Sequence, residues 1–312
     1  MSIAAYIKVI GRGKEGARPL SSDQAYDLFS QVLDGKVTDL EVGAFCLAMR
    51  IKGESVDELE GFVRAVHERC MPLPAAPEGV VILPSYNGAR KLPNLTALLA
   101  ASLAQRGIRV LVHGMRKDPT RVTTADVFEA LGWPLATSAA EVEQAWSTGQ
   151  PAFVDTATLC PGLARLLDAR WTIGLRNPGH TVAKLLSPVP VASGQRSIQV
   201  VNHTHPEYGD ALTSYLQHIA ATALLMRGTE GEPVADARRQ PKFDVFVDGT
   251  RHDDLSRAPE EGVLTTLPDL PEQFDAASTA RYIEAVLAGK QPLPPAIATQ
   301  VDCLAETLRT GR

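Results

Sequence analysis

The chain has 312 residues, of which 45% are apolar, 21% charged and 5% aromatic, and its formal net charge is −5. This mixture is typical of a globular protein with a sizeable buried core, and the acidic balance argues against a histone-like or tail-driven nucleic-acid binder. The sequence contains no run of 18 apolar residues and no signal-peptide pattern, so we expect a cytoplasmic protein without a membrane span.

Residues 1–72 predict a small unit of about four short helices. Ser21, Thr38 and Ser55 are each followed three positions later by Gln or Glu, which is the pattern of a capping box at a helix start. Apolar residues then recur at helical spacing after these positions. Residues 73–79 are rich in proline, which cannot continue a helix, so we expect a linker there.

Residues 80–312 alternate between strand-like and helix-like segments. Short runs of Val, Ile and Leu predict buried strands at residues 80–83, 108–112, 152–154, 197–201 and 222–226. Helical spacing predicts helices at residues 95–105, 125–131, 163–169, 277–288 and 296–308. We expect short strands and loops between 230 and 275. The fold class is therefore α/β: a small N-terminal helical bundle domain plus a larger α/β domain with a mostly parallel sheet flanked by helices.

The segment from Leu33 to Ser55, LDGKVTDLEVGAFCLAMRIKGES, is similar to the helical domain of anthranilate phosphoribosyltransferases. These enzymes share their architecture with the class II nucleoside phosphorylases, and the resemblance continues through the whole α/β domain. It implies the fold. It also implies one possible activity, in which a phosphoribosyl group passes from phosphoribosyl diphosphate, with Mg²⁺, to anthranilate or another acceptor.

The motifs that such an enzyme needs are altered in this chain. The family's GTGGDG loop is replaced by Ser85–Lys91 (SYNGARK), in which one glycine remains, and its KHGNR motif by Val112–Arg116 (VHGMR). The family's Asp-Glu pair, which handles magnesium, maps onto Glu232-Pro233. Since one carboxylate survives, we expect no metal site, with Glu232 as the single candidate ligand.

Four segments look like the YbiB-type DNA-binding paralogues of anthranilate phosphoribosyltransferase, within glycosyltransferase family 3. They are Gly11–Lys14, Ser85–Lys91, Asp118–Val122 and His205–Tyr208. That resemblance implies a homodimer formed through the helical domain and nucleic-acid binding with little sequence preference. It also implies that there is no cofactor and no transferase activity.

The distribution of charge favours this interpretation. Residues 85–122 hold seven basic residues and one acidic residue, a net charge of +6, and residues 161–196 have a net charge of +4. In the superfamily fold both segments border the mouth of the ligand cleft, where cations can contact phosphates. The predicted nucleic-acid-binding residues are Arg12, Lys14, Arg90, Lys91, Arg116, Lys117, Arg121, Arg170, Arg176 and Lys184.

A residual ligand pocket is predicted from the remaining family positions. Its expected residues are Ser85, Tyr86, Asn87, Gly88, Asn94, Thr96, His113, Gly114 and Thr120. Tyr86 could stack on a base or fill the vacated pocket, and His113 could line that pocket or be a core histidine. The sequence thus supports two functions, a nucleic-acid-binding homodimer and an active phosphoribosyl transferase.

Overall fold

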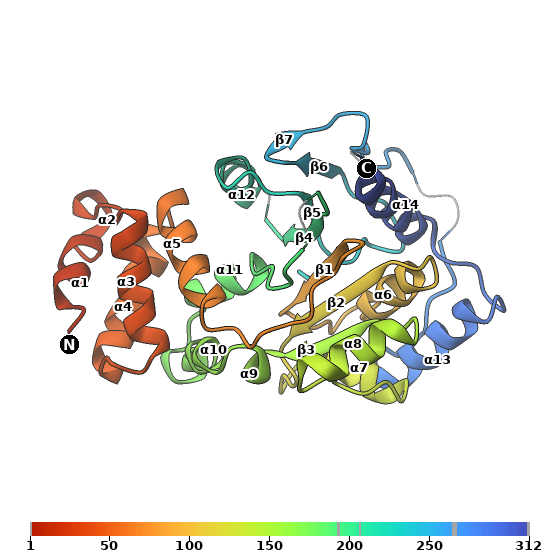
Figure 1. Cartoon of the computed structure of the whole chain (residues 1–312), viewed down its shortest axis with the longest axis horizontal. Coiled ribbons are helices and arrows are strands. Elements are labelled where there is room, and N and C mark those ends of the chain that lie inside the picture. The colour runs from red at the N-terminus through yellow and green to blue at the C-terminus, as the bar shows by residue number, and fades with distance from the viewer. Residues whose placement is uncertain (1, 192–193, 206, 264–266, 311–312) are drawn as a thin grey trace. The chain divides into compact units, whose positions relative to one another are not determined.

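The computed structural model describes residues 2–191, 194–205, 207–263 and 267–310 (Figure 1). The chain forms two compact units. Unit 1 contains Met1–Met71 and Thr156–Pro188, and unit 2 contains Pro72–Asp155 and Val189–Arg312. The first boundary between the units, after Met71, lies near the division expected at residue 72. Residues 80–312 do not form one continuous unit, because residues 156–188 pack with the N-terminal helices.

The regular secondary structure of unit 1 is all helical within its described residues. Its N-terminal part contains α1 (Ala4–Ile10), α2 (Gly13–Gly16), α3 (Ser22–Leu33), α4 (Asp39–Lys52) and α5 (Val56–His67). The returning segment contains α9 (Thr156–Leu159), α10 (Pro161–Ile173) and α11 (Pro178–Lys184). The predicted capping boxes are present at the starts of α3, α4 and α5, so these starts are encoded locally.

Three aromatic rings form the centre of the N-terminal bundle. Phe29 of α3 stacks on Phe62 of α5 with a centroid distance of 4.5 Å, and Phe45 of α4 meets both rings edge-on. All three side chains are fully buried. The returning helix α10 joins this unit through Arg165, whose guanidinium donates to the carbonyl of Leu33 at 2.7 Å.

Replacing Ser55 with Ala is expected to lower the free energy of unfolding by about 1 kcal/mol. The Ser55 hydroxyl accepts the Glu58 N–H at 3.2 Å, and the variant leaves this helical N–H without its cap. Urea denaturation measures the change. Ser214→Ala, on an exposed helical site, is the control and is expected to be neutral because alanine favours helix. Equal effects in the two variants would contradict the assignment of the cap.

Unit 2 is built on a seven-stranded sheet with the order β3-β2-β1-β4-β5-β6-β7. The strands are β1 (Val80–Ser85), β2 (Arg109–Gly114), β3 (Ala152–Asp155), β4 (Ser197–His203), β5 (Ala223–Arg227), β6 (Phe243–Val247) and β7 (Thr250–Arg251). The first five are mutually parallel, while β6 and β7 are added antiparallel. The helical-bundle-plus-α/β fold class is thus confirmed.

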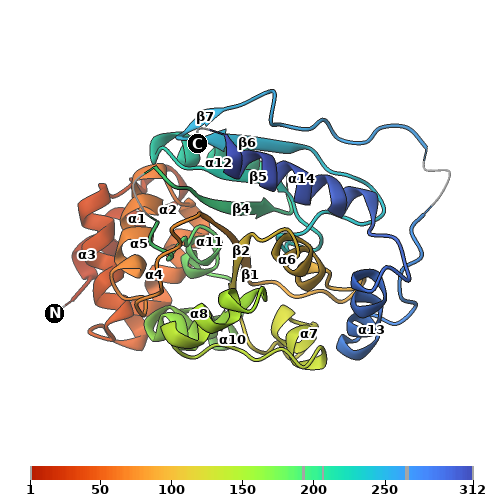
Figure 2. The same ribbon diagram turned by 45° about the vertical axis from the view of Figure 1, so that its right-hand side comes forward.

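Helices α6 (Thr96–Ala104), α7 (Thr124–Ala130), α13 (Ala276–Leu287) and α14 (Pro295–Arg309) share one large apolar core with the sheet. Figure 2 shows α6, α7 and α13 close together. Two further helices, α8 (Ala139–Ser147) and α12 (Glu207–His218), contact β3 and β5 respectively. The sequence did not predict α8, α9, α11 or α12. No helix within the described ranges is long and apolar enough to cross a membrane.

The strand order places a topological switch point between β1 and β4, where the chain winds in opposite directions. In open α/β sheets, ligands bind outside the carboxyl ends of the strands at such a point. The segment that leaves β1 at this point is Tyr86–Leu92. The fold therefore makes this loop the first candidate for a ligand-binding site.

Candidate functional site

The loop after β1 is held by a carboxylate that lies about 145 positions further along the chain. Glu232 is 1% exposed, and its Oε1 accepts the backbone N–H groups of Asn87 and Gly88, both at 2.8 Å. Its Oε2 accepts the hydroxyl of Ser85 and that of Thr124, the latter at 3.2 Å. A chain carboxylate thus occupies the centre of the loop, where backbone N–H groups would otherwise meet an anion.

A second carboxylate closes the outer half of the same loop. The backbone N–H groups of Arg90, Lys91 and Leu92 converge on Glu230 Oε1, at 3.2, 2.8 and 3.0 Å. Glu230 adopts a left-handed backbone conformation with φ of 52°, which is uncommon for a residue with a side chain. From Asn87 to Leu92, every backbone N–H therefore donates to one of these two carboxylates, except that of Ala89, which donates to the Val122 carbonyl.

Glycine is required at two positions of this site. Gly88 has φ of +65°, and an added Cβ would lie 3.0 Å from the Val122 carbonyl. Gly114 ends β2, and there a Cβ would lie 1.8 Å from the carbonyl of Ser85. Both glycines are therefore explained by close backbone approach within the sheet and loop.

Tyr86 and His113 form a buried pair beside the loop. The tyrosine is 2% exposed and the histidine is fully buried, and the tyrosine oxygen lies 2.9 Å from His113 Nδ1. Of the two expected roles for Tyr86, burial is compatible with the filling of the vacated pocket, which stays a prediction. Its ring is not available for stacking on a base, because stacking needs an exposed face.

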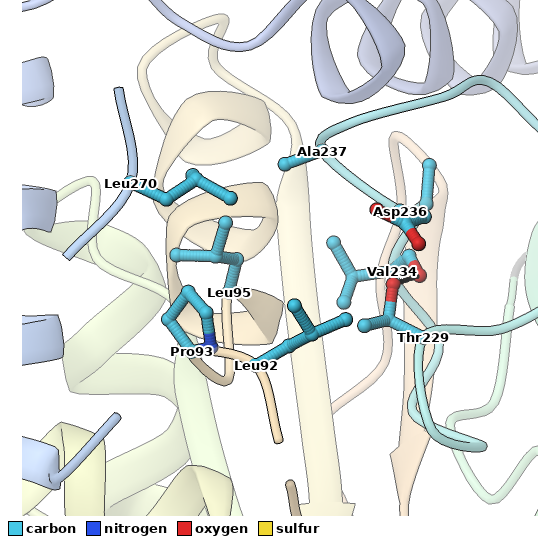
Figure 3. A pocket seen from close by; sticks show the side chains of 9 residues that line it. Leu92, Pro93, Leu95, Thr229, Val234, Asp236, Ala237 and Leu270 are labelled. Atoms are coloured by element: carbon cyan, nitrogen blue, oxygen red, sulfur yellow. Dashed lines mark hydrogen bonds between the residues drawn. The ribbon is translucent and has the colours of Figure 1, made fainter. Parts of the chain in front are cut away.

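A small cavity lies between this loop and the segment that carries Glu232 (Figure 3). Its volume is about 10 Å³, which is room for at most one water molecule. Figure 3 shows the apolar side chains of Leu92, Pro93 and Leu95, which precede α6, on one side, opposite the 229–237 segment. The lining residues are Leu92, Pro93, Leu95, Thr229, Val234, Ala235, Asp236, Ala237 and Leu270. None of the expected ligand-pocket residues lines this cavity.

The predicted cations of unit 2 differ in how far neighbouring acids compensate them. Arg116 pairs with Glu129 at 3.3 Å, and Lys117 pairs with both Asp126 at 2.6 Å and Glu129. Arg121 lies 3.8 Å from Glu230 and donates to the Gly88 carbonyl. By contrast, the exposed side chains of Arg90 and Lys91 form no ion pair with any residue in the described ranges. These two are the uncompensated cations of the loop.

Three of the predicted cations of unit 1 act electrostatically on one buried histidine. His180 is 7% exposed, and its pKa is lowered to about 3, first by burial and then by the charges of Arg176, Arg170 and Lys184. Arg12 is exposed before α2 and donates to the Lys8 carbonyl at 3.2 Å. The side chain of Lys14 lies outside the described part of the structure, as does Pro206 of the His205–Tyr208 segment.

Acidification is expected to destabilise unit 1 through His180. Because its pKa is lower in the folded chain than the usual 6.5, the unfolded chain binds the proton more tightly, so stability is full above pH 6.5 and falls below it. The loss between pH 7 and pH 5 is about 2 kcal/mol. Urea denaturation at the two pH values measures it, with His180→Gln as the comparison. A parallel loss in that variant would contradict the role of His180.

The expected pocket residues are brought together, with one exception. The side chains of Ser85, Asn87, Asn94 and Thr96 are buried. Ser85 and Thr96 donate to Glu232, Thr96 at 3.4 Å, while Asn87 donates to the Glu230 carbonyl. Asn94 donates to the Val122 carbonyl. Thr120 does not join them, because it is exposed and its hydroxyl donates to Asp118 in a local turn. Sequence reasoning did not single out Glu230, or Trp171 of α10, which is 52% exposed.

The family's magnesium chemistry does not fit this site. Glu232 uses both oxygens for internal donors, and Pro233 replaces the second carboxylate. Within the described ranges, no cluster of three or more His, Cys, Asp or Glu side chains is placed to hold a metal ion. The predicted absence of a cofactor stays a prediction.

Comparison with known proteins assigns the class of protein. Residues 4–70 match the helical bundle domain of a glycosyl transferase family, and residues 88–301 match the α/β domain of that family. The chain therefore belongs to this glycosyl transferase family.

The chain is 38% identical to the uncharacterized protein YbiB of Escherichia coli, over 97% of this chain and 93% of that protein. It is 28% identical to an anthranilate phosphoribosyltransferase of Methylorubrum extorquens, over 87% of this chain and 79% of the enzyme. The anthranilate phosphoribosyltransferase structure from Thermus thermophilus superposes with a TM-score of 0.73 at 20% identity, covering 98% of this chain and 94% of that one. The fold is thus anthranilate phosphoribosyltransferase-like.

Proposed function

We propose that this protein binds the phosphate backbone of nucleic acid with little sequence preference, as a homodimer, and does not transfer phosphoribosyl groups. The observation that carries the proposal is the loop after β1. Its inward N–H groups are taken by Glu232 and Glu230, while the side chains of Arg90 and Lys91 stand exposed and uncompensated. The loop thus presents cations to the outside of the fold instead of free N–H groups to its inside, which suits contact with phosphates on a polymer.

The transferase alternative finds less support in the same geometry. A phosphoribosyl diphosphate site needs free backbone donors and carboxylates for Mg²⁺. Here the backbone N–H groups of Asn87 and Gly88 already donate to Glu232, and Pro233 stands where the family has a second carboxylate. The surviving Asn94 and Thr96 are explained by hydrogen bonds that support the loop and α6.

An exposed apolar face on α4 supports the homodimer. Leu40, Leu47 and Ile51 are 84%, 48% and 58% exposed, and their spacing places them on one side of the helix. Leu47 and Ile51 also line a mainly apolar groove of about 260 Å³ that α1 and α4 border. A face of this kind is costly to leave in water, and a second copy of the chain would cover it symmetrically.

Titration of a fluorescent oligonucleotide at several salt concentrations tests the proposal. We expect binding well below 10⁻⁴ M at low salt, and a steep loss of affinity as salt rises. Replacing Arg90 and Lys91 with Ala is expected to weaken binding to all sequences alike and to reduce the salt slope by up to about two contacts. The reason is that each cation releases counterions from one phosphate.

A charge-matched variant separates a local effect from a general one. Arg106→Ala with Lys290→Ala removes the same two charges from other exposed sites of unit 2. We expect this control to retain most of the affinity. Binding weaker than about 10⁻⁴ M by the wild type, or equal losses in the two double variants, would contradict the proposal.

A further inference from the structure

One tryptophan of this chain is exposed where a soluble helix would ordinarily carry a polar residue. Trp171 lies in the last turn of α10 and is 52% exposed. The other two tryptophans are accounted for by the core of unit 2. Trp146 is 7% exposed and donates to the Val110 carbonyl, and Trp133 packs edge-on against Phe128 at 5.1 Å. Trp171 therefore needs a different explanation.

A guanidinium already lies over the indole ring. The Cζ atom of Arg170 is 4.1 Å from the Trp171 ring centroid, which is the distance of a cation–π contact. The contact holds the planar cation against the ring and orders two side chains at the surface. Because so much of Trp171 is still exposed, ring surface remains for a second planar group.

The surroundings of Trp171 carry positive charge. Arg176 and Lys184 follow in the turn before α11 and in α11 itself, and both act electrostatically on the same histidine as Arg170. Residues 161–188, which belong to unit 1, hold four basic residues and one acidic residue, a net charge of +3. A planar ring in contact with one cation, in a segment that carries further cations, is complementary to an unpaired base whose flanking phosphates are negative.

We propose that Trp171 is a stacking platform for an unpaired nucleobase, and that it makes the protein prefer single-stranded over double-stranded nucleic acid. The inference rests on the proposed function and adds a preference to it. In a duplex the base faces are already stacked on one another, so an exposed indole gains nothing without opening the helix. In a single strand any base can stack, so the contact leaves sequence tolerance intact.

The test compares Trp171→Ala, Trp171→Phe and wild type on a thymidine oligonucleotide of about 15 residues, the length of one single-strand binding site, and on a blunt hairpin duplex. We expect Trp171→Ala to bind the single strand roughly 5- to 100-fold more weakly, with a change of less than about threefold on the duplex. Trp171→Phe keeps an aromatic face and is expected to retain most of the single-strand affinity. Quenching of wild-type tryptophan fluorescence by the oligonucleotide, lost in Trp171→Phe, reports the stack directly.

Leu175→Ala is the matched control, because Leu175 is also exposed near the end of α10 but has no π face. Melting temperatures of all variants show that they are folded. Single-strand affinity that is unchanged in Trp171→Ala, or equal losses on both ligands, would overturn the stacking platform while leaving the proposed function in place. A wild type that binds neither ligand would overturn both.

Discussion

Replacing Glu232 with Ala is expected to lower the free energy of unfolding by about 2–5 kcal/mol, the largest single-site effect on stability that we predict. The variant removes the acceptor for the buried N–H groups of Asn87 and Gly88 and for three hydroxyls around them. Each buried donor left unpaired costs about 1–3 kcal/mol, and some of that cost is recovered by water that enters the space. Urea denaturation measures the change.

The same variant is expected to gain an anion site. With the carboxylate gone, the freed donors form a cradle that inorganic phosphate can occupy, so phosphate should stabilise Glu232→Ala and leave the wild type unchanged. At about 10 mM phosphate and a Kd of about 1 mM, the gain is about 1.4 kcal/mol. The measurement is the urea midpoint with and without phosphate, at constant ionic strength.

Glu230→Ala provides the control for both results. Glu230 also accepts several backbone N–H groups, but it lies near the surface, where water can replace it. We expect a loss below about 1 kcal/mol. Two results would contradict the assignment of Glu232 to an anion-binding loop. One is a loss of unfolding free energy in Glu230→Ala as large as in Glu232→Ala, and the other is no stabilisation of Glu232→Ala by phosphate.

The parts of the fold that the sequence predicted are those with local signals. Ser21, Thr38 and Ser55 each form a complete capping box with the residue three positions later, so three helix starts were correct. The apolar runs at 80–83 and 108–112 were correct as buried parallel strands, because such strands need no alternation. Helix α11 was missed because it begins with Pro178 and Gly179, a pair that is typical of a turn.

The candidate site was predictable only in part, because its key contacts join distant segments. The residues of the loop after β1 were identified from a motif, but the partner of Asn87 lies 145 positions away. The sequence of the Thr229–Glu232 segment contains one signal that could have identified these partners, namely a turn in which two glutamates flank a glycine. Tyr86 cannot stack on a base because it is buried, and no local sequence pattern predicts whether a residue at the end of a strand is buried.

Charge counting located the basic segments but not their compensation. The count for residues 85–122 treats Arg116, Lys117 and Arg90 alike, whereas the structure pairs the first two with Glu129 and leaves the third exposed. Acids on α7 lie beyond the counted segment, so the sequence overstated the free charge there. A surface potential depends on such pairs more than on the sum.

The α4 face makes the second large prediction: Leu47→Glu with Ile51→Glu is expected to convert the proposed homodimer into a monomer. Both side chains are about half exposed in a single copy and would be buried in the dimer. A carboxylate buried without a partner costs several kcal/mol, so two of them should weaken the dimer by at least about 10³-fold. Sedimentation equilibrium of both proteins at micromolar concentration measures this change.

Ile219→Glu is the control for that result, because it places one carboxylate on an exposed apolar residue of unit 2. It is expected to leave the association state unchanged. The monomeric α4 variant should also bind long oligonucleotides with a shallower salt dependence, since one copy of the chain brings half as many cations to the strand. A wild type that sediments as a monomer would remove the homodimer from the proposal, and the salt dependence would then report contacts from a single chain.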